Sequence, residues 1–166
     1  GGARSGKSRL AEQTAASAHL PVSYVATAQA WDDEMQARIG HHQTQRPAEW
    51  LLIEEPLHLA ERLQRIDQAG QMILVDCLTL WLSNLLFAGV AASQAEEGKV
   101  VDCPLLTGET QALVDLLPQL PGRVIMVSNE VGWGVVSEHE SGRLFADLLG
   151  RANQALGAIV DDVVLL

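Results

Sequence analysis

Short apolar runs alternate along the chain with longer stretches in which apolar residues recur every three or four positions. The short runs are rich in β-branched and aliphatic side chains, as buried strands are, and cover 22–27, 50–54, 72–75, 124–127 and 163–166. The longer stretches have helical spacing and cover 7–18, 32–42, 57–68, 78–87, 110–117 and 141–160. Residues 89–110 mix Ala, Ser, Gly, Pro and acidic side chains, which favours a loop. The alternation predicts an α/β fold with a mostly parallel sheet and helices on both faces.

Length and composition narrow the class of protein. A chain of 166 residues suits one domain, so we expect residues 1–166 to form a single unit with a sizeable core. Hydrophobic residues make up 48% of the chain, which excludes a disordered protein, and no apolar run is long enough to span a membrane. The net charge of −10 argues against nucleic acid as a partner. Cys77 and Cys103 are too few for a disulfide scaffold, so a reducing, cytoplasmic setting is expected.

The first eight residues, GGARSGKS, fit the pattern G-x-x-x-x-G-K-S/T and are called the phosphate loop here. Small residues let backbone N–H groups close around phosphate oxygens, and the helix that follows points the positive end of its dipole at the same place. Lys7 can reach the β- and γ-phosphates of a nucleotide, and the Ser8 hydroxyl can bind Mg²⁺. A plain glycine-rich turn is the alternative, but a helical pattern follows at once and Lys7 is one of only two lysines. The predicted nucleotide contacts are Gly1, Gly2, Ala3, Arg4, Ser5, Gly6, Lys7 and Ser8.

A second candidate is the strand pattern at 72–76, MILVD, which ends in a carboxylate. Many buried strands end in Asp, so this pattern alone indicates little. In a chain that also has a phosphate loop, it predicts that Asp76 holds Mg²⁺, directly or through water.

Between these two motifs lies a polar segment that contains Arg38, His42 and Arg46 at intervals of four. On a helix, residues four apart share a face, and two arginines around a histidine would suit a polyphosphate. Pro47 ends any helix there. Periodicity by itself favours the simpler interpretation, a solvated polar end of a helix.

Several segments together resemble one family: GGARSGKSRLAE, YVATAQAWDDEMQARIGHHQTQRPAEW, ILVDCLTLWLSNLLF, VSNEVGWGVV and GRANQAL. In these segments the chain resembles the bifunctional adenosylcobinamide kinase / adenosylcobinamide-phosphate guanylyltransferase of cobalamin biosynthesis. The resemblance implies a RecA-like phosphate-loop fold, a homotrimer and two reactions. First, ATP or GTP phosphorylates the aminopropanol hydroxyl of adenosylcobinamide. Then GMP passes from GTP to that phosphate through a GMP–histidine intermediate, and pyrophosphate is released.

The family's histidine follows a Met and an Arg-Ile pair and precedes Arg-Pro. Met35 and the pair at 38–39 align with this pattern and place the histidine that carries GMP at His42. The adjacent His41 would point about 100° away on a helix. A neutral imidazole nitrogen is nucleophilic near pH 7, which suits attack on the α-phosphorus of GTP.

By the same resemblance, Thr27, Arg46, Glu54 and Asp76 are nucleotide-binding residues. The family often has Glu at the position of Asp76, which is one methylene shorter. A carboxylate suits guanine, because the N1–H and the N2 amine of that base are donors. The sequence leaves open which acidic side chain binds the guanine base.

Two other functions fit parts of the sequence. A kinase alone would need the phosphate loop but no nucleophilic histidine, because phosphoryl passes directly between bound substrates. A nucleotide-binding regulator would need no set of residues for Mg²⁺ chemistry. His42 favours the bifunctional enzyme over the kinase, and the set of Lys7, Ser8 and Asp76 favours it over the regulator.

Some features stay open at this point. Asn129 and Glu130 end a predicted strand, where α/β sheets place ligands, but a turn would explain them equally well. Trp31 and Trp133 flank motif segments and could line a corrinoid pocket. A phosphate loop normally follows a central strand, and we expect that strand to precede Gly1.

Overall fold

The computed structural model describes residues 1–29, 47–89, 91–97 and 101–166. These residues contain one four-stranded sheet in the order β2-β1-β3-β4, and all of its pairs are parallel. The strands are β1 (Val22–Ala26), β2 (Leu51–Glu54), β3 (Met72–Asp76) and β4 (Arg123–Val127). The predicted parallel α/β sheet is confirmed, and its strands begin and end within one residue of the predicted bounds.

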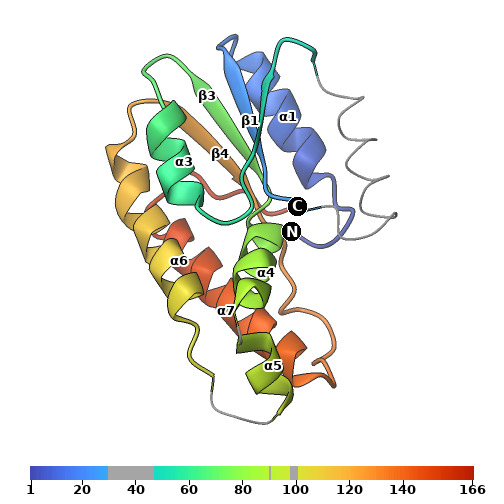
Figure 1. Cartoon of the computed structure of the whole chain (residues 1–166). Coiled ribbons are helices and arrows are strands. Elements are labelled where there is room, and N and C mark those ends of the chain that lie inside the picture. Colours follow the sequence, from blue (N-terminus) through green and yellow to red (C-terminus); the bar gives the residue numbers. More distant parts are fainter. Residues whose placement is uncertain (30–46, 90, 98–100) are drawn as a thin grey trace.

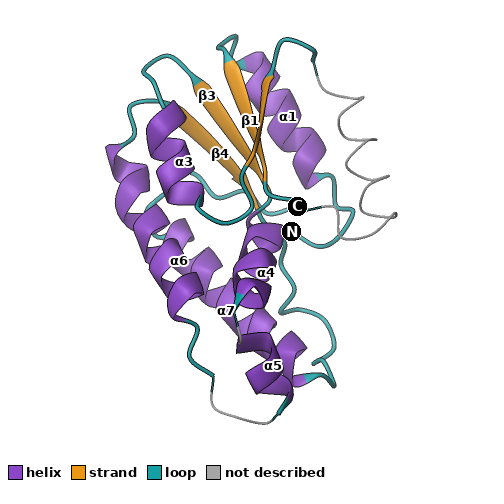
Figure 2. Ribbon diagram, viewed as in Figure 1, coloured by secondary structure: helices purple, strands orange, loops and turns teal. Residues whose placement is uncertain are grey.

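Helices cover both faces of this sheet (Figures 1 and 2). α1 (Lys7–Ser17) lies on one face, and α3 (Leu59–Ile66) and α6 (Pro104–Leu116) lie on the other. α4 (Leu78–Ala88) starts near the sheet and extends beyond the carboxyl ends of its strands, whereas α7 (Glu140–Gly157) begins beyond those ends and runs back toward the sheet. The 3₁₀ turn η1 (Leu117–Gln119) links α6 to β4.

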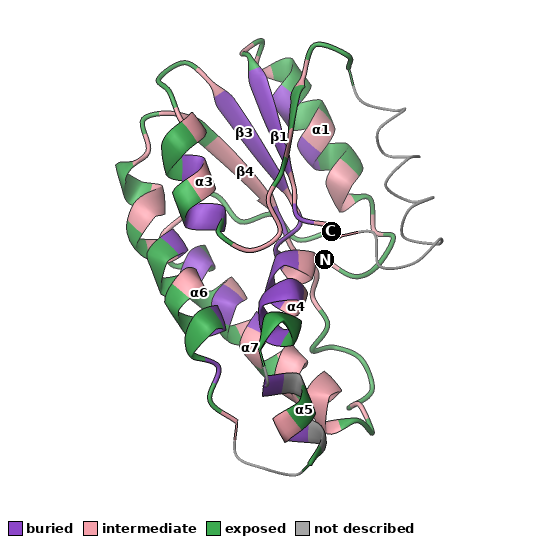
Figure 3. Ribbon diagram, in the orientation of Figure 1, coloured by how far each residue is buried: buried purple, intermediate pink, exposed green. Residues whose placement is uncertain are grey.

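Burial follows the alternation of side chains along each strand. Leu74 and Tyr24 pack in a cluster beneath α1, whereas Val75 and Val25 join a larger cluster on the opposite face. The central strands β1 and β3 are buried along almost their whole length, and β2 is largely exposed (Figure 3). A near-continuous apolar run with helices on both sides is what a central parallel strand requires.

The prediction of a loop at 89–110 is wrong. That stretch contains α5 (Ala91–Glu96) and the first turns of α6, which begins at Pro104. Proline suits the first turn of a helix because its missing N–H would have no helical partner there. Gly108 and the small side chains weakened the helical signal, but Leu106 is buried and anchors the first turns of α6 in the core.

The prediction of a strand at 163–166 is also wrong. The segment pairs with none of the four strands, and its side chains are exposed, from 72% at Val163 to 44% at Leu166. A β-branched run forms a strand only where a neighbour offers ladder hydrogen bonds. The segment ends beside the phosphate loop, so close that a side chain at Gly1 would collide with the backbone of Leu166.

Two carboxylates fix the N-terminal end of α3. Glu55 accepts hydrogen bonds from the amides of Leu57 and His58, at 3.2 and 2.9 Å, and from Arg62 Nε at 3.2 Å. Burial would raise the pKa of Glu55, but these hydrogen bonds together lower it. His58 Nδ1 lies 2.9 Å from the Oε1 atom of Glu109 on α6, so this pair joins the two helices on that face.

The His58–Glu109 pair should make stability depend on pH. The hydrogen bond to Glu109 raises the pKa of His58 above its ordinary value, against a smaller effect of burial. A raised pKa means that the pair stabilises the folded state fully below the ordinary histidine pKa, and that this contribution is lost as pH rises through the folded pKa. We expect a double-mutant cycle of His58→Gln and Glu109→Gln, measured by urea unfolding, to show stronger coupling at pH 5.5 than at pH 9. Equal coupling at both values would contradict the assignment.

Candidate active site

The phosphate loop curls around its own lysine. Gly6 precedes α1 with φ at 94°, a left-handed conformation that glycine adopts at little cost, and its carbonyl accepts the first helical bond from Leu10 N at 3.0 Å. Lys7 Nζ donates to the carbonyl of Gly2 and lies 3.5 Å from Ser5 Oγ. The ammonium group is therefore held inside the loop, where a phosphate would bind, at the N-terminus of an eleven-residue helix.

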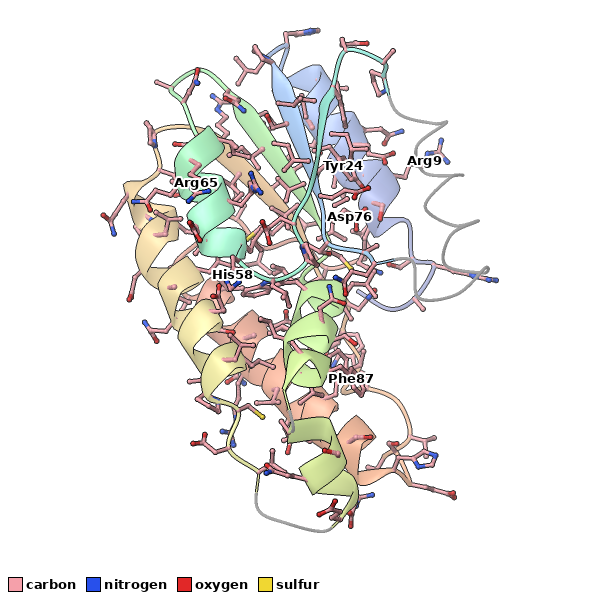
Figure 4. All side chains as sticks on the ribbon, in the orientation of Figure 1. Arg9, Tyr24, His58, Arg65, Asp76 and Phe87 are labelled. Atoms are coloured by element: carbon pink, nitrogen blue, oxygen red, sulfur yellow. The ribbon has the colours of Figure 1, made fainter. Side chains whose placement is uncertain are left out.

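Asp76 shares the α1 face of the sheet with that helix. It follows Leu74 by two residues on β3, so its side chain points to the same side as Leu74, which packs in the cluster beneath α1. Tyr24 OH donates to Asp76 Oδ2 at 3.0 Å, and Figure 4 shows the two side chains next to α1. The carboxylate is thus oriented by the Tyr24 hydroxyl, which contacts one of its two oxygens in the described part of the chain.

Glu54 occupies the same register row as Asp76. Ala26 of β1 pairs with Glu54 on one side and with Asp76 on the other, so all three side chains point to the α1 face at the carboxyl edge. Only the methyl group of Ala26 separates the two carboxylate positions along this row. Glu54 is exposed and Asp76 is half-buried, so both are accessible to a ligand at this edge.

Thr27 comes one residue after Ala26, just past the end of β1. Its side chain is fully buried, its hydroxyl donates to the carbonyl of Cys77 at 2.7 Å, and the hydroxyl oxygen accepts from the Cys77 amide at 2.9 Å. Its own carbonyl accepts from Asn84 Nδ2 at 2.7 Å. Thr27 therefore ties β1 to the start of α4.

Cys77 is a core residue beside the site, as expected from the sequence. Burial, together with the charge of Asp76, raises the pKa of its thiol to about 11. The thiolate is the reactive form, so the native thiol should be inert at ordinary pH.

We expect iodoacetamide at pH 8 to leave Cys77 unmodified in the folded protein and to alkylate it in 8 M urea. Intact-mass and peptide mass spectrometry would measure both states. Cys103 is buried as well, with its pKa raised by burial and by Asp102, and should behave in the same way. Alkylation of Cys77 in the folded protein would contradict this prediction, because it would show that the core around the thiol opens to the reagent.

The segment after β4 reaches the phosphate loop. Glu130 N donates to the carbonyl of Gly1 at 2.8 Å, and the Glu130 side chain accepts from Gly132 N at 2.8 Å. Asn129 is held by hydrogen bonds to α4 and α7. Farther along, Trp133 is 77% exposed. The sequence does not predict this contact, because only the folded register brings the segment to residue 1.

Other predicted site features lie outside the described residues. These are the helix at 32–42, the polar segment with Arg38, the catalytic His42, the nucleotide contact Arg46 and Trp31. Within the described ranges, no group of three or more His, Cys, Asp or Glu side chains could hold a metal ion. No helix in the described part of the chain is long and apolar enough to cross a membrane.

Comparison with known families decides what this arrangement belongs to. The family described as cobinamide kinase / cobinamide phosphate guanyltransferase matches residues 1–166. The chain belongs to this family. The family's two activities are those that the sequence resemblance implied, and the sheet and phosphate loop described above form its nucleotide-binding fold.

Curated relatives agree with the family match. The bifunctional adenosylcobalamin biosynthesis protein CobP of Pseudomonas aeruginosa is 51% identical over 156 residues, which cover 94% of this chain and 83% of the relative. The protein CobU of Salmonella typhimurium, also named bifunctional in adenosylcobalamin biosynthesis, is 41% identical over 167 residues, with 100% of this chain and 92% of the relative covered. The Escherichia coli protein of the same name is 38% identical over the same shares.

Proposed function

We propose that this protein phosphorylates adenosylcobinamide with ATP or GTP and then transfers GMP from GTP to the resulting phosphate. The product would be adenosyl-GDP-cobinamide, an intermediate of cobalamin biosynthesis. The observation that carries the proposal is the phosphate loop with Lys7 held inside it, in a chain that matches the family over residues 1–166. Asp76 and Glu54 on the same sheet face support nucleotide chemistry at that place.

In the kinase step, the loop would bind the triphosphate through backbone N–H groups and the ammonium group of Lys7. The aminopropanol oxygen would attack the γ-phosphorus and release its proton to water, while the bond from that phosphorus to the β-bridging oxygen breaks. The nucleoside diphosphate leaves with the bridging oxygen. Lys7 would exchange its contacts with Gly2 and Ser5 for contacts with the nucleotide. Its positive charge would then offset the negative charge that develops on the nucleoside diphosphate as it leaves.

In the transfer step, a nitrogen of His42 attacks the α-phosphorus of GTP and pyrophosphate leaves. A phosphate oxygen of the cobinamide phosphate then attacks the same phosphorus, the N–P bond breaks, and the imidazole is restored. Two displacements replace one difficult reaction between two anions. Arg46, by its place after His42 in the sequence, is proposed to bind the phosphates.

Mg²⁺ is the proposed cofactor, with Ser8 and Asp76 as its protein ligands. The donor set fits this ion, because a hydroxyl and a carboxylate offer hard oxygens, and Mg²⁺ is usually held by one or two protein ligands with substrate phosphates and water. Among the described residues, Tyr24 occupies one carboxylate oxygen of Asp76, and the other would bind the ion. The ion would neutralise charge on the phosphates during both transfers.

The test is a two-stage assay with the intact protein, Mg²⁺, GTP and adenosylcobinamide, followed by mass spectrometry. We expect cobinamide phosphate first and adenosyl-GDP-cobinamide with pyrophosphate later. Without corrin substrate, Mg²⁺ and GTP should add one GMP to the protein in an acid-labile bond. Cobinamide phosphate as the only product, with no GMP adduct, would instead identify a kinase alone.

A homotrimer and a cytoplasmic setting are further parts of the proposal. The exposed apolar side chains after β4, with Val135 at 99% and Val136 at 75%, would suit association or contact with the corrin ring beside Trp133. Both cysteines are free, which suits a reducing compartment. Light scattering coupled to size exclusion would give the number of subunits.

A further inference from the structure

A chain of hydrogen bonds joins α4, α7 and the segment after β4. Thr79 Oγ1, in the first turn of α4, accepts from both nitrogens of Asn129: from the amide at 2.9 Å and from Nδ2 at 3.1 Å. Asn153 Nδ2, on α7, donates to the carbonyl of Asn129 at 3.1 Å. Asn153 Oδ1 in turn accepts from the hydroxyl of Ser128 at 2.7 Å.

These bonds leave Asn129 little freedom. Its amide, its carbonyl and its side-chain nitrogen are each engaged, by two helices that are far apart in sequence. Thr79, Asn129 and Asn153 are all half-buried, so water competes less for the bonds than it would at the surface. The position of the backbone at residue 129 is therefore set by α4 and α7 and not by β4 alone.

The next residue, Glu130, contacts the phosphate loop, so the position of Asn129 affects that loop. Glu130 N donates to the carbonyl of Gly1 at 2.8 Å, which fixes the first peptide of the loop against the segment after β4. At the other end of the loop, Gly6 begins α1. Among the described residues, the loop is thus continued by its helix at one end and contacted near Gly1 by the peptide that follows Asn129.

We propose that Asn129 is a positioning residue of the nucleotide site, and that Thr79 and Asn153 hold it so that Glu130 keeps the phosphate loop in its binding conformation. The inference rests on the proposed function only in that the loop binds a nucleoside triphosphate. Loss of the hydroxyl of Thr79 should weaken binding of the triphosphate in both reactions equally, because both would use this loop. The corrin substrate should bind as before.

The experiment measures binding of Mg²⁺ and the β,γ-imido analogue of GTP by calorimetry, without any turnover. Thr79→Val keeps the shape of the side chain and removes the acceptor, and we expect the Kd to rise about tenfold. Thr79→Ser restores the hydroxyl and should return the Kd to within about twofold of wild type. Asn153→Asp removes the donor to Asn129 while keeping an acceptor for Ser128, and should weaken binding by a similar factor.

Thr110→Val is the matched control. Thr110 lies on α6, and its buried hydroxyl has no hydrogen-bond partner among the described residues, so the same substitution removes no bond. Its Kd should equal that of wild type. Melting temperatures of all variants separate a loss of folding from a loss of binding.

The proposal is overturned if Thr79→Val and Asn153→Asp bind the analogue as wild type does, whatever their melting temperatures. It is also overturned if Thr79→Ser binds as weakly as Thr79→Val, because the hydroxyl would then not be the cause. A wild-type protein that binds the analogue but converts no adenosylcobinamide would contradict the proposed function and leave this test intact.

Discussion

Replacing His42 by asparagine abolishes transfer of GMP but leaves phosphorylation of adenosylcobinamide within about a few-fold of wild type. We expect the rate of guanylyl transfer to fall by about 10⁴-fold or more, the scale on which loss of a covalent nucleophile acts. The kinase step passes phosphoryl directly between substrates bound at the phosphate loop and needs no histidine. The two activities should therefore separate in one variant.

The measurement follows both products by chromatography and the GMP adduct by intact-mass spectrometry. His41→Asn is the matched control, because it removes the neighbouring imidazole and should keep the adduct and both activities. If the adduct persists in His42→Asn and disappears in His41→Asn, the nucleophile is His41. An equal loss of both activities in His42→Asn would instead indicate a structural role for His42.

The fold could be predicted from the sequence where the pattern was strong. The strand at 72–75 is a continuous apolar run between turn residues, and its period and length leave few alternatives. The start of α6 could not be predicted, because Gly108 and Pro104 are usually signs of a loop. Only tertiary packing, with Leu106 and Leu113 in the core, makes that stretch helical.

Site residues within one motif could be predicted, but contacts between motifs could not. The phosphate loop is local, so GGARSGKS is enough to predict it. Tyr24 and Asp76 are 52 residues apart, and their hydrogen bond depends on the register of two parallel strands. Thr27 shows the same limit, because its hydrogen bonds to Cys77 join residues 50 apart and depend on how β1 lies beside the start of α4.

The net charge of −10 suggests an acidic outer surface around a locally basic nucleotide site. The structure places Glu54 and Asp76 on the α1 face at the carboxyl edge, next to the helix that begins with Lys7. A site of this kind has both signs of charge: a cation for phosphate, and carboxylates for a metal ion or for guanine. Two carboxylates on this face would repel a bare triphosphate, so the proposed Mg²⁺ has a physical reason to bind with the nucleotide.

The phosphate loop yields the second large effect. Lys7→Met keeps most of the aliphatic stem of the side chain and removes the ammonium group that now contacts Gly2 and Ser5. Because one loop would bind the triphosphate in both reactions, we expect kcat/KM to fall by about 10³-fold in the kinase step and in GMP transfer alike. The melting temperature should change little, since these contacts of Lys7 lie within its own loop.

Arg9→Met is the control for charge. Arg9 is exposed on α1, two residues after Lys7, and projects outward from that helix (Figure 4). Its replacement removes the same unit of positive charge from the same helix. If net charge alone were the cause, kcat/KM would therefore fall by the same factor in Arg9→Met and in Lys7→Met. Activity assays at two salt concentrations would separate long-range attraction, which salt screens, from direct contact. If Lys7→Met kept more than about a tenth of either activity, the phosphate loop would not be the shared site, and the two reactions would need separate ones.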